Sequence, residues 1–223
     1  MTRIVKVWDL PVRLFHWSLV LLVVTSFVSA KIGGNAMQVH LLAGYAVLAL
    51  LLFRILWGLL GGTHARFASF VRSPLAVIAY LKALKQDKAE HHLGHNPAGA
   101  WSVILMLLAL LAQAATGLFA NDDISTEGPL AKLVSKALSD RITGMHHLNV
   151  KLLLALIGLH LSAIAFYFFY KRENLVKPMI TGFKEAAGGL GEGMQKQGKV
   201  WLAAVLLAIC ACCVYLLLKI PAA

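Results

Sequence analysis

Long apolar runs dominate this chain and alternate with shorter polar stretches. A helix needs roughly 20 predominantly apolar residues to cross about 30 Å of hydrocarbon. The first run is expected to stay in the membrane rather than be cleaved as a signal peptide, because further runs follow at once. The pattern predicts an all-α membrane protein whose spans are Leu10–Ala30, Met37–Leu60, Ala98–Ala120, Gly144–Tyr170 and Val200–Leu218.

Three polar stretches have features of their own. Ser73-Pro74 is typical of a helix start, since it places a cap before a proline in the first turn. Apolar positions then recur at helical spacing up to Leu84, which predicts a short amphipathic helix at the membrane surface. Residues 121–141 are predicted to form a charged loop, and residues 183–199 a glycine-rich linker that is flexible or partly helical.

Composition and charge agree with a membrane protein. Hydrophobic residues make up 59% of the chain and charged residues 14%, and the mean hydropathy is +0.75. The formal net charge of +11 does not indicate a nucleic-acid partner, because lysine and arginine gather in particular loops. They are most frequent before the first span and after the second and fourth. The positive-inside rule therefore predicts a cytoplasmic N-terminus and, after five spans, a periplasmic C-terminus.

The positions of the cysteines indicate a packing role rather than a metal or redox site. Cys210, Cys212 and Cys213 all fall in the last apolar run, with no accessory metal ligand nearby. The chain also has no Cys-x-x-Cys-His motif, no cysteine set for an iron–sulfur cluster and no dinucleotide-binding fingerprint.

Histidines inside the apolar runs carry the functional prediction. Ionisable side chains are costly in hydrocarbon and are functional by default. His16 and His160 fall in the cytoplasmic half of their spans, while His40 and His146 fall near the periplasmic ends of theirs. His146 and His160 are fourteen residues apart, so they share nearly one helix face about 21 Å apart along the axis. A lone histidine would more often lie at the level of the lipid headgroups or form a hydrogen bond between helices. Two pairs at matching depths instead predict two stacked haems. The predicted pairs are His16–His160 and His40–His146.

Neighbouring residues complete the predicted sites. His146 lies about 40° from His160 on a helical wheel and His147 about 140°, so His146 is the ligand and His147 its neighbour. Glycines would leave room for a porphyrin edge, namely Gly44, Gly117 and Gly158. Basic candidates for haem propionates are Arg13, Arg54 and Arg141. Candidates near a quinone or a proton path are His147, Lys151 and His95, although Lys151 is also placed to snorkel to the surface.

Two motifs and one helix resemble a known family. The opening Val7-Trp8-Asp9-Leu10-Pro11-Val12-Arg13-Leu14-Phe15-His16-Trp17, the stretch Gly94-His95-Asn96-Pro97-Ala98-Gly99 and the helix from His146 to His160 resemble bacterial cytochrome b561 proteins and the b-type cytochrome subunits of nickel–iron hydrogenases. The resemblance covers roughly residues 4 to 182. It implies a four-helix core with two b haems, whose ligands come from helices one, two and four and fall on the same four histidines.

The resemblance also implies a domain division. Residues 1–182 would form the di-haem core, residues 183–199 a cytoplasmic linker, and residues 200–223 a fifth membrane helix outside the family pattern.

Three functions stay open. The first is electron transfer between the membrane quinone pool and a periplasmic redox protein, such as a cytochrome c or a hydrogenase, in a bacterial inner membrane. The second is a superoxide:quinone oxidoreductase, which needs a cationic periplasmic face. The outer residues Lys31, Lys132, Lys136, Arg141 and Lys151 would supply that face, although four outer acids dilute it. The third is a haem-free metal or solute transporter, which the paired depths and the lack of intramembrane carboxylates disfavour.

Overall fold

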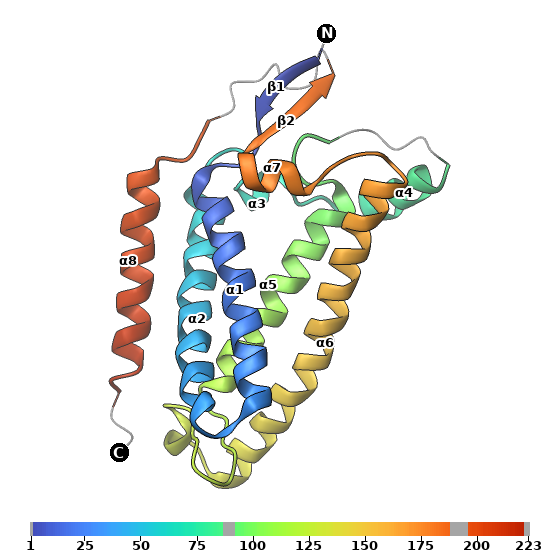
Figure 1. The fold of residues 1–223 in the computed structure, drawn as a ribbon. Helices are drawn as coiled ribbons and strands as arrows, with labels where there is room; N and C mark the ends of the chain where they lie inside the picture. The colour runs from blue at the N-terminus through green and yellow to red at the C-terminus, as the bar shows by residue number, and fades with distance from the viewer. Residues whose placement is uncertain (1, 87–91, 188–195, 221–223) are drawn as a thin grey trace. The chain divides into compact units, whose positions relative to one another are not determined.

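The computed structural model describes residues 2–86, 92–187 and 196–220. Its five long helices are all long and apolar enough to cross a membrane, which confirms the predicted spans (Figure 1). They are α1 Leu10–Ile32, α2 Met37–Leu60, α5 Pro97–Gly117, α6 Lys136–Phe169 and α8 Val200–Leu217. The chain is an all-α membrane protein apart from one small sheet.

Helix α6 begins at Lys136, two turns before the predicted Gly144. Ser135 precedes it, and its hydroxyl accepts a hydrogen bond from the backbone N–H of Leu138 at 3.3 Å. Such a cap satisfies an N–H group that has no partner within the helix. The first turns of α6 are polar, so an apolar run cannot reveal them.

The chain divides into two compact units, which are described separately. The first unit comprises Met1–Leu14, Ile55–Met106 and Leu156–Ala203, and the second comprises Phe15–Arg54, Leu107–Ala155 and Ala204–Ala223. Each of the five long helices contributes residues to both units.

The first unit contains a two-stranded antiparallel sheet (Figure 1). Strand β1 Thr2–Lys6 pairs with β2 Phe183–Ala187, so β2 falls in a segment for which a flexible or partly helical linker was predicted. Gly182 links β2 to the short helix α7 Val176–Thr181, and its φ of 89° is left-handed. A Cβ there would lie 2.9 Å from the carbonyl oxygen of Trp8, so only glycine fits.

The polar segment between α2 and α5 forms α3 Phe67–Phe70 and α4 Pro74–Lys85. The predicted cap is confirmed, because the Ser73 hydroxyl accepts a hydrogen bond from Ala76 N–H. Tyr80 anchors α4: its hydroxyl lies 2.5 Å from that of Tyr167, which also accepts a hydrogen bond from Asn96. Burial, followed by the contact with Tyr167, raises the pKa of Tyr80, so this phenol stays protonated.

Asp9 organises the start of α1. Its carboxylate accepts hydrogen bonds from Val12 N–H at 2.9 Å and from the fully buried Trp57 indole at 3.2 Å. The segment that leads into α8 is bound here too, because Thr63 N–H donates to the Lys196 carbonyl and Lys196 N–H donates to the Thr63 hydroxyl. The beginning of α8 is therefore attached to the first unit.

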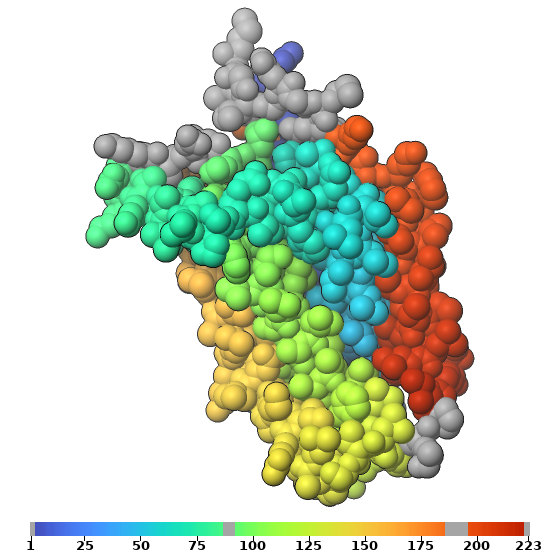
Figure 2. Space-filling view, turned by 180° about the vertical axis from the view of Figure 1, so that it is seen from behind, coloured from blue at the N-terminus to red at the C-terminus, as the bar shows by residue number. Residues whose placement is uncertain are grey.

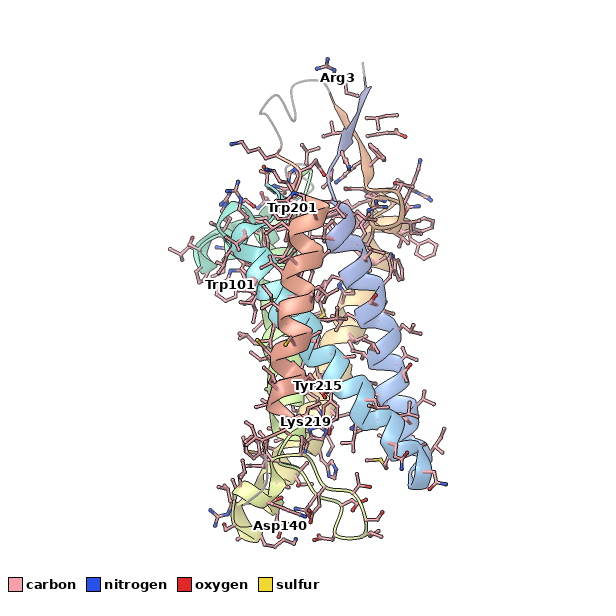
Figure 3. The ribbon with its side chains drawn as sticks, turned by 90° about the vertical axis from the view of Figure 1, so that its left-hand side faces the viewer. Arg3, Trp101, Asp140, Trp201, Tyr215 and Lys219 are labelled. Atoms are coloured by element: carbon pink, nitrogen blue, oxygen red, sulfur yellow. The ribbon has the colours of Figure 1, made fainter. Side chains whose placement is uncertain are left out.

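In the second unit α8 packs against α2 (Figures 2 and 3). Val214 belongs to a buried cluster with Leu48 and Ala49 of α2. Cys210 lies one turn before Val214 and is also buried, whereas the other two cysteines of α8 are exposed. Of the three cysteines, Cys210 is thus the one that packs inside the protein.

The loop between α5 and α6 forms hydrogen bonds within itself. It contains the short 3-10 helix η2 Ala131–Leu133; a second such helix, η1 Gly34–Ala36, precedes α2. The Asp122 carboxylate accepts three backbone N–H groups, those of Ile124, Ser125 and Thr126. These hydrogen bonds lower the pKa of Asp122 to about 2. The carboxylate therefore stays charged, and continues to cap the turn, through the pH range in which ordinary carboxyl groups become protonated.

Candidate functional site

Two of the four predicted ligands lie together in the second unit. His40 is in the first turn of α2 and His146 is in α6. Their ring centroids are 6.2 Å apart, and the ring planes are nearly perpendicular at 83°. Both side chains are partly buried.

The hydrogen bond of His40 identifies its tautomer. His40 Nδ1 lies 2.8 Å from the backbone carbonyl oxygen of Ser26 in α1. A carbonyl can only accept, so Nδ1 carries the hydrogen and Nε2 keeps its lone pair. His40 is thus prepared to bind a metal through Nε2.

Thr116 of α5 contacts the His146 ring. The Thr116 hydroxyl has one hydrogen, and the α5 backbone carbonyls of Ala112 at 2.7 Å and Gln113 at 3.1 Å lie within its reach. With its hydrogen on this side, the hydroxyl can accept from His146 Nδ1, which lies 3.1 Å away. In that arrangement Nε2 keeps a lone pair, as in His40.

Two side-chain amides on the other side of His146 assign the tautomer. Asn149 Nδ2 donates to the Ala109 carbonyl at 2.9 Å and to Gln113 Oε1 at 2.8 Å. This orients the Gln113 amide so that its nitrogen faces His146 Nε2 at 2.8 Å. Nε2 accepts this hydrogen bond, so Nδ1 carries the hydrogen.

The sequence reading missed these three polar residues. Gln113, Thr116 and Asn149 each lie inside a predicted span, where uncharged polar side chains are also costly unless they are hydrogen-bonded. That cost was the available signal. The contacts themselves join α5 to α6 across more than thirty positions of the chain, so sequence spacing does not reveal them.

The geometry fits a haem iron between the two rings. A metal–imidazole bond is about 2 Å long and a ring centroid lies about 1 Å from its nitrogen, so imidazoles that share one metal have centroids about 6 Å apart. The observed spacing of 6.2 Å meets this condition. In this structure the Gln113 amide faces His146 Nε2, so the flexible Gln113 side chain would have to turn aside for a metal to bind there.

Two glycines leave space around this pair. A Cβ on Gly117 would lie 3.1 Å from His146 Cε1, so the ring packs directly on the α5 backbone at this position. A Cβ on Gly44, one turn after His40, would meet nothing within 4 Å. The first glycine lets the His146 ring pack on α5, and the second leaves open space one turn after His40. Gly158 on α6 is likewise open.

The remaining two predicted ligands belong to different units. His16 of α1 falls in the second unit and His160 of α6 in the first. Both are partly buried. His146 and His160 lie on one continuous helix, as the spacing predicted. The pairing of His16 with His160 stays a prediction.

The candidate residues of the first unit make other contacts. Arg13 Nη1 donates to the Ile180 carbonyl at 2.5 Å, beside the turn at Gly182. The His95 ring packs between aromatic side chains, with centroids 4.7 Å from Trp8 and 4.6 Å from Phe70. A hydrogen bond therefore holds Arg13 in place, and ring packing holds His95.

The candidates of the second unit differ in burial. Arg54 is only 3% exposed, in keeping with the rule that the few charged side chains in membrane helices face the protein interior. Arg141, His147 and Lys151 are exposed on α6, and the His147 ring centroid is 6.2 Å from that of His146. The structure thus brings His147 close to the His40–His146 pair, whereas Arg54 is the buried cation.

Comparison with known proteins identifies the family. Residues 7–182 match the model of the family described as prokaryotic cytochrome b561. Curated relatives named "Probable Ni/Fe-hydrogenase B-type cytochrome subunit" are 25% identical over 210 residues in Rhizobium leguminosarum bv. viciae and 26% identical over 221 residues in Azotobacter vinelandii. The matches cover 80% of this chain and 87% of the first relative, and 81% and 88% for the second. No solved structure gives a significant match. The chain belongs to the prokaryotic cytochrome b561 family and is a multi-pass membrane b-type cytochrome of electron transfer.

Proposed function

We propose that this cytochrome holds two b haems and carries electrons across the membrane between the quinone pool and a periplasmic redox protein. The observation that carries the proposal is the His40–His146 pair, whose spacing and tautomers suit two axial ligands of one iron. His16 and His160 are the proposed ligands of the second haem. When bound, the haems would supply one-electron carriers.

The ligand type favours electron transfer over chemistry at the metal. Two imidazoles would hold each haem, and a haem held in this way would supply one-electron transfer rather than a binding position for substrate. Hydrogen bonds to the second nitrogen of each ring hold the ligands in place and limit rearrangement between redox states. Ser26 and Thr116 have this role for His40 and His146.

The orientation is proposed from the loop charges. Lysine and arginine gather before α1, between α2 and α5 and after α6, which puts those segments in the cytoplasm of a bacterial inner membrane. The His40–His146 haem is then the outer one, and His16–His160 the inner one. Arg13 and Arg54 would compensate the inner propionates and Arg141 the outer propionates.

The partner is proposed from the relatives. They are named as hydrogenase cytochrome subunits. A hydrogenase-like or cytochrome c-like protein at the periplasmic side would exchange electrons with the outer haem. His147 and Lys151 at that side, or His95 at the other, are proposed to serve the quinone.

The superoxide alternative loses support at the outer face. Lys136 forms ion pairs with Asp123 and Asp140, so its charge is compensated. A cationic funnel needs uncompensated positive charge to speed the arrival of a small anion. The remaining exposed lysines form a weaker attracting field.

Stopped-flow mixing tests the proposal. A quinol should reduce the haems of the oxidised protein at least as fast as the protein turns over with its substrates. A superoxide pulse should reduce them slowly, at a rate that does not depend on the salt concentration. Lys151→Gln should slow the quinol reaction several-fold, and Lys132→Gln, a matched exposed lysine, should leave it unchanged. Reduction by superoxide near the diffusion limit, falling steeply with ionic strength, would replace the partner hypothesis with the oxidoreductase.

A further inference from the structure

We propose that Thr116 is a positioning residue for the outer haem: its hydroxyl fixes the Nδ1–H tautomer of His146 and sets the basicity of this ligand. The inference rests on the proposed function, because it takes His146 as an iron ligand. It assigns a role to α5, a helix that supplies none of the proposed ligands.

The first step is the direction of the hydrogen bonds. Thr116 directs its only hydrogen to its own helix and accepts from His146 Nδ1. On the opposite side of the ring, the Gln113 amide nitrogen donates to Nε2. The Gln113 contact requires the Nδ1–H tautomer, and the Thr116 hydroxyl is then the acceptor of the Nδ1 hydrogen. The ring therefore presents Nε2 as its lone-pair nitrogen, which is the form that binds iron.

The second step is the placement of the contacts. Thr116 and Gly117 follow Gln113 by three and four positions, so both lie on the same face of α5 as Gln113. Gln113 and Thr116 contact His146, and a Cβ added at Gly117 would contact it too. Asn149, one turn after His146 on α6, fixes the Gln113 amide. One face of α5 thus determines both the orientation and the protonation of a ligand on α6.

The third step is the difference between the two ligands. His40 donates to a backbone carbonyl, whereas His146 donates to a hydroxyl that is itself polarised by donating to Ala112. An acceptor at Nδ1 raises the basicity of the ligating nitrogen and favours the oxidised metal. Removal of the Thr116 hydroxyl should therefore make the outer haem easier to reduce and leave the inner haem unchanged.

Redox titration of two matched variants tests this. Thr116→Val keeps the shape of the side chain but removes the acceptor, and Thr116→Ser keeps the acceptor. We expect the midpoint potential of the outer haem to become more positive in T116V and to return close to the wild-type value in T116S. The outer haem is identified as the one that His146→Ala removes. Loss of that haem in T116V but not in T116S would also support the proposal.

Electron paramagnetic resonance gives a second measurement. The signal of the oxidised outer haem reports the orientation and basicity of its axial rings, and it should change in T116V and in Gly117→Ala. Gly144→Ala is the matched control, because a Cβ at Gly144 meets nothing within 4 Å. Unchanged potentials and unchanged signals in T116V would overturn the inference. If His146→Ala keeps both haems, the proposed ligand set fails instead, so the two failures are distinguishable.

Discussion

Replacement of His146 by alanine should reduce the haem content from two b haems per chain to one. The alanine removes one of the two imidazoles proposed to hold this haem and leaves His40 as its one protein ligand. A site built for two imidazoles should then bind its haem much more weakly and lose it during purification. Haem extracted from the purified protein and divided by its concentration measures the effect.

His147→Ala is the comparison variant for this experiment. His147 is adjacent to His146 on α6 but is exposed and makes no ring contact with His40 among those described. It should keep both haems. A His146→Ala protein with two haems, or a His147→Ala protein with one, would show that the wrong histidine has been assigned.

Double replacements should reveal which histidines share an iron. His40→Ala with His146→Ala removes two ligands of the same haem, so one haem should remain. His40→Ala with His160→Ala removes one ligand from each haem, so none should remain. This contrast is large, and it tests the pairing even for His16 and His160, which lie in different units of the structure.

The same haem counts would also show whether the histidines pair the other way. If the His40/His160 double variant keeps one haem while the His40/His146 double variant keeps none, the partners are exchanged. Folding is checked by gel filtration in detergent and by the helical signal in circular dichroism, which should match the wild type in every variant that is interpreted.

The membrane helices could be predicted from sequence because their signal is local. An apolar run of the right length suffices, and α2 begins and ends where it was predicted. The beginning of α6 was missed because its first turns are polar and depend on a cap at Ser135. The sheet of β1 and β2 was missed because its two strands are about 180 residues apart in the chain.

The candidate site was predictable only in part. His40 and His146 could be found because an imidazole in an apolar run is conspicuous and depth can be read from the spans. Gln113, Thr116 and Asn149 could not be assigned, since uncharged polar residues are common in spans and their meaning depends on contacts between α5 and α6. Tautomers likewise require the hydrogen-bond partners to be known.

The haem count of the wild-type protein tests the central claim most directly. A reduced-minus-oxidised spectrum identifies b haem, and a pyridine haemochrome assay on the same sample gives its amount relative to protein. The ligand set His16, His40, His146 and His160 predicts two b haems per chain. A chain that is saturated with a single haem, or that binds none when haem is supplied, would contradict the account.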